Sequence, residues 1–162
     1  FYIGTDPSPF LIRRAREVYE SENRQFVSGN AYELPFSQRQ FDSVFSVMVW
    51  HLLGDLQTAA LEMSRVLRPD GRFLIVTANP NAYPEWAELY VNPKTDGRRF
   101  EGDMPGDGKT LDHDVLYFHT LDEILGSLKL AKFEIGSVVP FRKSKPGQGR
   151  EYLISIQGTL PG

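Results

Sequence analysis

The 162-residue sequence has no cysteine, no long apolar run and no marked excess of either charge. The absence of cysteine excludes disulfides, thiolate metal sites and thiol nucleophiles, and is compatible with a reducing compartment. No segment approaches the roughly 20 consecutive apolar residues of a membrane-spanning helix. Lys and Arg total 18 against 21 Asp and Glu, a formal net charge of −3, so the field of the whole chain does not attract nucleic acid or anionic lipid. We therefore expect a cytoplasmic protein whose partners are neither nucleic acids nor membranes.

The chain has enough apolar material for one core, with 41% hydrophobic and 12% aromatic residues. We expect residues 1–162 to form a single domain. Ser8 and Pro9 predict the start of a helix directly after the first apolar strand, because serine caps a helix and proline suits its first turn. The helical spacing predicts that this helix buries the face formed by Leu11, Ile12, Ala15, Val18 and Tyr19.

Two later segments, residues 41–49 and 72–77, are apolar on both alternations, as the central strands of a parallel sheet are. Between them Asp55 can cap a helix, so a right-handed parallel crossover is expected. The buried stripe predicted for that helix is Leu56, Ala59, Ala60, Met63, Val66 and Leu67. A capping box at 120–123 predicts a last helix, and residues 132–139 and 151–157 predict an antiparallel hairpin. The expected fold is α/β, a doubly wound and mostly parallel sheet with a C-terminal hairpin.

Residues 79–119 have no clean period and are too long for a passive connection in a compact domain. We interpret them as a lid or substrate-recognition insertion, because aromatic side chains on such a segment can cover a ligand. Tyr83, Trp86 and Tyr117 are its candidate substrate-binding residues. An alternative of similar weight is that these aromatics form a satellite core of their own.

Four motifs, in this order and spacing, resemble those of a class I S-adenosylmethionine-dependent methyltransferase that acts on small molecules. They are Gly4–Ser8, Gly29–Phe36, Phe41–Val44 and Arg65–Gly71. The resemblance implies S-adenosyl-L-methionine as cofactor and a small-molecule acceptor. The glycine-rich loop of the family, and the strand before it, have no match. We therefore expect a fragment that lacks the first strand and is inactive or weak alone, with a gap or a direct pairing between the strand ending at Asp6 and residues 41–49.

The resemblance also implies a set of cofactor-binding residues. Asp6 would hold the ribose diol, Pro7 would pack on adenine, and Asn30 would face the adenine amine. The backbone of Ala31 would contact the adenine ring, and Ser46 and Val47 would line the methionine side. Two of these assignments have structural alternatives: Asp6 as an acid favoured at a helix start, and Asn30 as an ordinary turn residue.

His51 follows the buried strand closely and titrates near neutrality, so it is the candidate general base; a packing or capping role is its alternative. No metal site is expected from Asp112–Asp114 and His119, which lack a clear fourth ligand. Two other functions stay open: a nicotinamide-dependent oxidoreductase, which also places an acid on ribose, and a non-catalytic interaction module. The sequence does not indicate the methyl acceptor or the oligomeric state.

Overall fold

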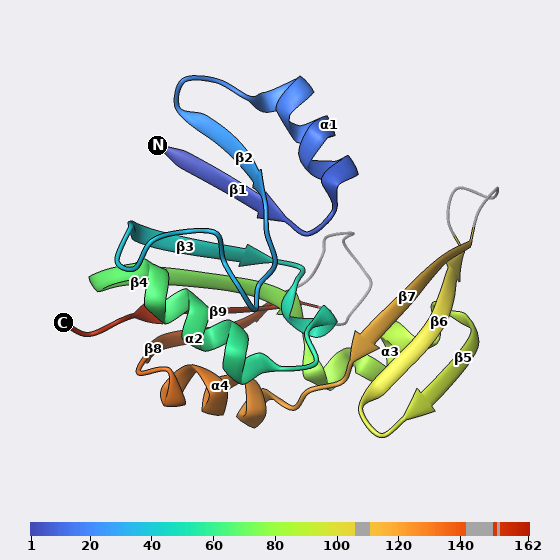
Figure 1. Cartoon of the computed structure of the whole chain (residues 1–162). Helices are drawn as coiled ribbons and strands as arrows, with labels where there is room; N and C mark the ends of the chain where they lie inside the picture. Colours follow the sequence, from blue (N-terminus) through green and yellow to red (C-terminus); the bar gives the residue numbers. More distant parts are fainter. Residues whose placement is uncertain (106–110, 142–150, 152) are drawn as a thin grey trace.

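The computed structural model of the chain describes residues 1–105, 111–141, 151 and 153–162 (Figure 1). It begins with a small unit in which β1 (Tyr2–Asp6) pairs in parallel with β2 (Arg24–Ser28). The helix α1 (Pro9–Tyr19) connects the two strands, and the Ser8 hydroxyl caps it by accepting the Leu11 N–H. This unit forms a two-stranded sheet separate from the rest of the fold.

The predicted buried face of α1 is only partly correct. Ile12 is buried, whereas Leu11, Val18 and Tyr19 are each about half exposed, at 52%, 48% and 56%. The physical reason is the size of the unit: two strands offer one helix too little apolar surface to cover its whole stripe.

The main sheet has the strand order β3–β4–β9–β8. Its first pair, β3 (Phe41–Val47) and β4 (Leu67–Ala78), is parallel. The predicted C-terminal hairpin is present, since β8 (Glu134–Phe141) and β9 (Leu153–Thr159) are antiparallel and β9 also pairs with β4. A mostly parallel sheet was predicted; in this sheet one of the three pairings is parallel.

The strand β4 begins five residues before the predicted start at residue 72. Leu67 already pairs with Phe41, and the pairing resumes at Ser43 with Arg72 after a register shift. The turn expected at this point is still present as a bulge, where Asp70 has a positive φ of 63° and its N–H donates to the carbonyl of Leu160.

Two helices, α2 (Leu56–Val66) and α4 (Leu121–Leu130), lie side by side on one face of the main sheet (Figure 1). The predicted stripe of α2 is buried throughout. The capping box of α4 is also confirmed: the Thr120 hydroxyl accepts the Glu123 N–H, and the Glu123 carboxylate accepts the Thr120 N–H. A short 3-10 turn, η1 (Trp50–Leu52), joins β3 to the loop before α2.

The described residues of this range, 79–105 and 111–119, form an arm with secondary structure of its own, which the sequence analysis did not predict. A 3-10 turn, η2 (Pro80–Ala82), and the helix α3 (Tyr83–Ala87) lead into an antiparallel sheet of β5 (Val91–Asp96), β6 (Arg99–Pro105) and β7 (Leu111–Tyr117). In Figure 1 this sheet lies beyond the carboxyl ends of β3 and β4.

The strands β1 and β3 do not pair with each other. Of the two expected arrangements, a gap or a direct pairing, the structure has the gap, and a groove of about 760 Å³ lies there. That a first strand is missing remains a prediction. The groove matters for function because the carboxyl ends of β1 and β3, where open α/β sheets bind ligands, meet beside it.

Candidate functional site

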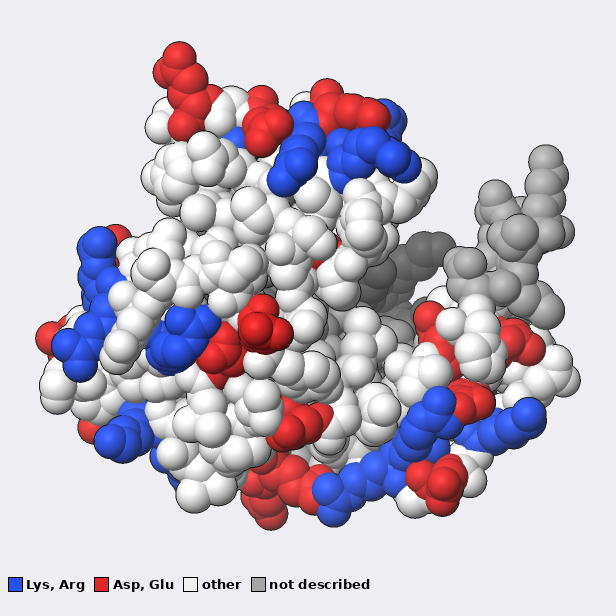
Figure 2. Space-filling model, in the orientation of Figure 1, with Lys and Arg blue, Asp and Glu red and all other residues white. Residues whose placement is uncertain are grey.

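The groove collects most of the predicted cofactor-binding residues. The loops after β1 and β2 and the end of β3 contribute five of the six, which are Asp6, Pro7, Ala31, Ser46 and Val47. Its volume is within the range of small-molecule and cofactor sites. Of its lining side chains only Asp6, Asp42 and Arg68 are charged, and Arg68 pairs with Asp42 at 2.6 Å. Figure 2 accordingly shows a largely uncharged surface between the upper unit and the main sheet.

The two carboxylate oxygens of Asp6 have different surroundings. Its Oδ1 accepts the N–H of Ser8 at 2.8 Å, which is the helix-start role considered above. Within the described part of the chain, no hydrogen bond involves Oδ2. Asp6 is half-buried on the wall of the groove, and one backbone donor orients its carboxylate. Its second oxygen can therefore accept a ligand hydroxyl.

Asn30 is already used by the backbone. Its Oδ1 accepts the N–H of Tyr32 at 2.7 Å and the N–H of Glu33 at 3.1 Å, which is the turn role that the sequence left open. Asn30 is also absent from the groove lining, although its neighbours Gly29 and Ala31 are present. Its contact with adenine remains a prediction, and it requires the carbonyl to exchange these bonds for a new one.

The loop 29–36 is held against α2 by a partly buried ion pair that the sequence analysis did not single out. Glu62 accepts the N–H of Leu34 at 2.7 Å and pairs with Arg65 at 2.7 Å. Arg65 in turn donates to the carbonyls of Phe36 and Leu34 at 2.7 and 2.9 Å. The signal available in sequence was the acid and base three positions apart on one helix face.

A second contact anchors the same loop at the other end of α2. The Tyr32 hydroxyl accepts the N–H of Gly54 at 2.9 Å, directly before the helix begins. The loop that carries Ala31 into the groove is therefore held near both the first and the last turn of α2.

His51 is buried in η1, and its environment favours the neutral ring. Burial lowers its pKa from 6.5 to about 4, although the nearby Asp114 opposes this shift. The Thr77 hydroxyl oxygen accepts the backbone N–H of His51 at 3.2 Å and lies 3.1 Å from Nδ1. Because a hydroxyl can donate its proton or accept a second one, this contact is compatible with either neutral tautomer of the ring. The action of His51 as a base remains a prediction.

The aromatic side chains of the arm pack mainly on one another. Tyr83, Phe118 and Phe100 stack in succession, with centroids 4.5 and 5.1 Å apart, and Tyr90 packs edge-on against Phe100. Burial raises the pKa of Tyr83 to about 12. This is the satellite core that the sequence analysis weighed as an alternative, and it is distinct from the main core.

The other two candidate substrate residues lie near the end of β3. Trp86 is beside His51, with ring centroids 6.1 Å apart, and Tyr117 stacks on His119 and contacts Gly54. The structure thus places Trp86 with His51 but does not bring Tyr83, Trp86 or Tyr117 into the groove lining. Their role toward a substrate remains a prediction.

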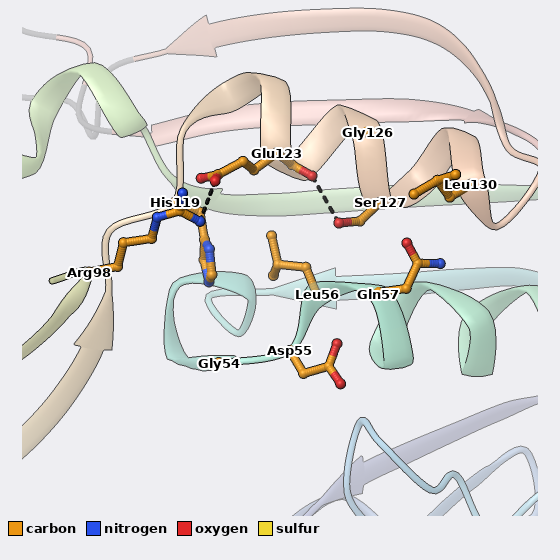
Figure 3. Close-up of a pocket in the computed structure, with 10 residues that line it drawn as sticks. All are labelled: Gly54, Asp55, Leu56, Gln57, Arg98, His119, Glu123, Gly126, Ser127 and Leu130. Atoms are coloured by element: carbon orange, nitrogen blue, oxygen red, sulfur yellow. Dashed lines mark hydrogen bonds and ion pairs between the residues drawn. The ribbon is translucent and has the colours of Figure 1, made fainter.

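A second, shallower hollow of about 440 Å³ lies between the start of α2 and the face of α4 (Figure 3). Several of its polar side chains have partners within the chain: Arg98 pairs with Glu123, the Ser127 hydroxyl donates to the Glu123 carbonyl at 2.9 Å, and His119 Nε2 contacts the Leu53 carbonyl at 2.6 Å. The His119 contact joins the segment before α4 to the loop before α2, and we place the functional site in the larger groove.

Comparison with known proteins finds similar methyltransferases. Residues 1–75 match the family model described as a methyltransferase domain. One similar solved structure is an S-adenosylmethionine-dependent methyltransferase from Mesorhizobium loti, with a TM-score of 0.72 at 20% identity over 97% of this chain and 79% of that chain. A second, from Listeria monocytogenes, has a TM-score of 0.77 at 14% identity over 99% and 80%.

The matched residues are 75 of the chain's 162, and the solved structures, at 20% and 14% identity, show that the chain has the methyltransferase fold. Among curated proteins, a fatty-acid O-methyltransferase of Mycolicibacterium smegmatis is 37% identical over 86 residues, which cover 52% of this chain and 31% of that protein. A phthiotriol/phenolphthiotriol dimycocerosates methyltransferase of Mycobacterium leprae is 30% identical over 94 residues, or 57% and 35%. The matched segments thus span about a third of these curated relatives. Within the described residues, no helix is long and apolar enough to cross a membrane.

Proposed function

We propose that this chain is part of a class I methyltransferase and takes part in methyl transfer from S-adenosylmethionine to a small-molecule acceptor, with the cofactor in the groove between β1 and β3. The observation that supports this most strongly is the convergence of Asp6, Pro7, Ala31, Ser46 and Val47 on one groove, from three separate chain segments. Both curated relatives described above are named as methyltransferases of lipid-like acceptors, so a fatty acid is the first acceptor to test.

The residues of the groove fit the adenosine half of the cofactor. The Oδ2 of Asp6 can accept a ribose hydroxyl, because Oδ1 is already fixed by Ser8. Pro7 and Ala31 offer an apolar wall and, at Ala31, a backbone N–H for a flat heterocycle. Ser46 and Val47, at the end of β3, lie next to the position of the methionine side.

The chemistry requires mostly orientation from the protein. When bound, S-adenosylmethionine supplies a methyl group on a sulfonium, which is a good leaving group. Holding an acceptor atom in line with that methyl group contributes much of the rate. His51 is not part of the groove lining, and its pKa of about 4 keeps the ring neutral at pH 7. We assign it the role of orienting, through Nε2, an acceptor that extends past the end of β3.

The test is a titration of the full chain with S-adenosylhomocysteine up to millimolar concentration, in which NMR monitors binding. We expect weak, saturable binding, and a further loss of about tenfold in Asp6→Asn, the equivalent of one charge-assisted hydrogen bond. Asparagine keeps the oxygen that accepts the Ser8 N–H, so the variant removes only the charge and the second acceptor.

The matched control is Asp42→Asn, an acid on the same groove whose side chain is 82% exposed and which pairs with Arg68. It should bind as the unmodified chain does. Tighter binding of NAD than of S-adenosylhomocysteine would favour an oxidoreductase, and equal affinity of both variants would remove Asp6 from the site. Absence of any adenosyl ligand binding would leave the interaction module as the better interpretation.

A further inference from the structure

The arm contributes a carboxylate and an aromatic ring to the surroundings of His51. The strand β7 packs against η1, and Asp114 of β7 is the charged group whose attraction to His51 opposes the effect of burial. Trp86 of α3 lies beside the same ring, at a centroid distance of 6.1 Å. Two separate elements of the arm therefore meet at His51, which directly follows the groove-lining Trp50.

The Asp114 carboxylate is held in place by Tyr90. The Tyr90 hydroxyl donates to Oδ2 of Asp114 at 3.0 Å. Burial raises the pKa of Tyr90 and the Asp114 carboxylate raises it further, so the hydroxyl keeps its proton and remains a donor. Gly102 lies opposite Asp114 in the β6–β7 register, and a Cβ there would come within 2.9 Å of the Tyr90 side chain. The glycine thus provides the space in which Tyr90 reaches the carboxylate.

Asp114 and His51 each retain one polar atom without a partner. Within the described part of the chain, no hydrogen bond involves Oδ1 of Asp114 or Nε2 of His51. His51 is only 6% exposed, and buried polar groups in native proteins are almost always hydrogen-bonded, if not to protein then to water or a ligand. Asp114 is half-buried, so a ligand can approach it from solvent.

The charges of the arm favour a cation beside Asp114. Among the described residues of the arm, Arg98 and Arg99 each pair with a glutamate. Lys94 interacts with Asp103, whose side chain lies on the opposite face of the sheet from Asp114, because neighbouring strand positions alternate between faces. An ammonium group suits both an unneutralised carboxylate and the face of an indole ring. An anionic ligand would be repelled.

We propose that Asp114, Trp86 and His51 form the acceptor end of the site and recognise a small molecule that carries an amine. The inference rests on the proposed methyl transfer and names its acceptor class. The ammonium group pairs with Oδ1 of Asp114 and contacts the Trp86 indole, while Nε2 of His51 binds a polar atom of the acceptor. Trp86 and Asp114 lie outside residues 1–75, which match the family model. They can therefore give this chain a different acceptor from the fatty acid in its relative's name.

The test uses three probes with the same alkyl chain, which are hexylamine, 1-hexanol and hexanoate. Each is titrated into the full chain at pH 7 without any adenosyl ligand, and the indole N–H signals are monitored by NMR. The chain has two tryptophans, so Trp86→Phe assigns both signals. Hexylamine should shift the Trp86 signal saturably and bind at least about tenfold more tightly than the other probes, the equivalent of one charge-assisted hydrogen bond.

A pair of variants tests the role of the carboxylate. Asp114→Asn should lower the affinity for hexylamine about tenfold and abolish the preference over 1-hexanol. Asparagine keeps an oxygen for the Tyr90 hydroxyl, so the variant removes the charge and retains this contact. The matched control is Asp103→Asn, an acid on the opposite face of the same sheet, which pairs with His113 at 2.9 Å. It should bind hexylamine as the unmodified chain does.

Equal or tighter binding of either other probe would overturn the proposal, as would a loss in Asp114→Asn no greater than that in Asp103→Asn. A Trp86 signal that none of the probes shifts would also overturn it. The proposed function is read separately, from the shift of the groove-lining Trp50 with S-adenosylhomocysteine. Preference for hexylamine without a Trp50 response would remove the cofactor site alone, and the reverse pattern would remove the amine site alone.

Discussion

Replacing Arg65 by methionine should lower the free energy of unfolding by about 2 kcal/mol. The guanidinium donates to two loop carbonyls, those of Leu34 and Phe36, and to both oxygens of Glu62. Hydrogen bonds to charged groups contribute about 1.5–3 kcal/mol each when buried. The side chains of Arg65 and Glu62 are 35% and 17% exposed, so solvent screening reduces the sum substantially. Methionine keeps the packing of the stem and removes only the donors.

The assay is urea unfolding, with Arg68→Met as the matched control. Arg68 also forms an ion pair near the groove, but its side chain and that of Asp42 are 53% and 82% exposed. Exposed pairs contribute at most about 1 kcal/mol, so this variant should lose less than half as much stability. An equal or smaller loss in Arg65→Met would refute the reasoning that the loop 29–36 is held by this pair.

The pH dependence of the same comparison gives a second readout. The hydrogen bond from Arg65 is the largest favourable influence on Glu62 and holds the pKa of this carboxyl below its ordinary 4.5. A depressed folded pKa contributes stability that is present above pH 4.5 and lost as the pH falls through the folded value. The difference between the unmodified chain and Arg65→Met should therefore shrink below pH 4.5.

Two further predictions concern single positions. Gly158→Ala should lower the free energy of unfolding by more than about 3 kcal/mol, because an added Cβ would overlap the backbone carbonyl of Glu134 across the β8–β9 pair. Gly126→Ala, in open space on α4, should raise it by about 0.5–1 kcal/mol. Melting temperatures of the two variants that shift in the same direction would contradict these expectations. The folded pKa of His51 is about 4, against an ordinary value of 6.5. Its contribution to the free energy of unfolding, about 3 kcal/mol, is therefore present above pH 6.5 and lost as the pH falls toward 4. The stability of His51→Gln should decline less steeply over this interval, and parallel pH profiles would contradict the assignment.

The parts of the fold that could be predicted from sequence are those with strong local signals. The stripe of α2 and the Thr120–Glu123 capping box are short-range patterns, and both formed as expected. The arm was missed because β5 contains a proline and all six of its residues are exposed, so it lacks the usual alternation. One signal was available, the dipeptide Asp96-Gly97 at the turn from β5 to β6. This dipeptide favours tight hairpin turns.

The site was less accessible to sequence reasoning, because roles there depend on partners distant along the chain. Nδ1 of His51 contacts the hydroxyl of Thr77, 26 residues later, and no local pattern shows that contact. Asp6 could be placed at a strand end, but its division into one capping and one free oxygen required the position of Ser8. For Asn30 the local alternative, a turn residue, describes its bonds in this structure.

The arrangement of the groove links cofactor binding to the position of the β1–β2 unit. One wall belongs to the β1–β2 unit and the other to β3, and the loop 29–36, held by Glu62 and Arg65, leads from one to the other. A ligand that contacts both walls favours the arrangement in which they have the correct spacing. S-adenosylhomocysteine should therefore slow amide hydrogen exchange on both walls, in β1 and in β3, and Asp6→Asn should reduce this slowing on both. Slowing on one wall alone would contradict the link.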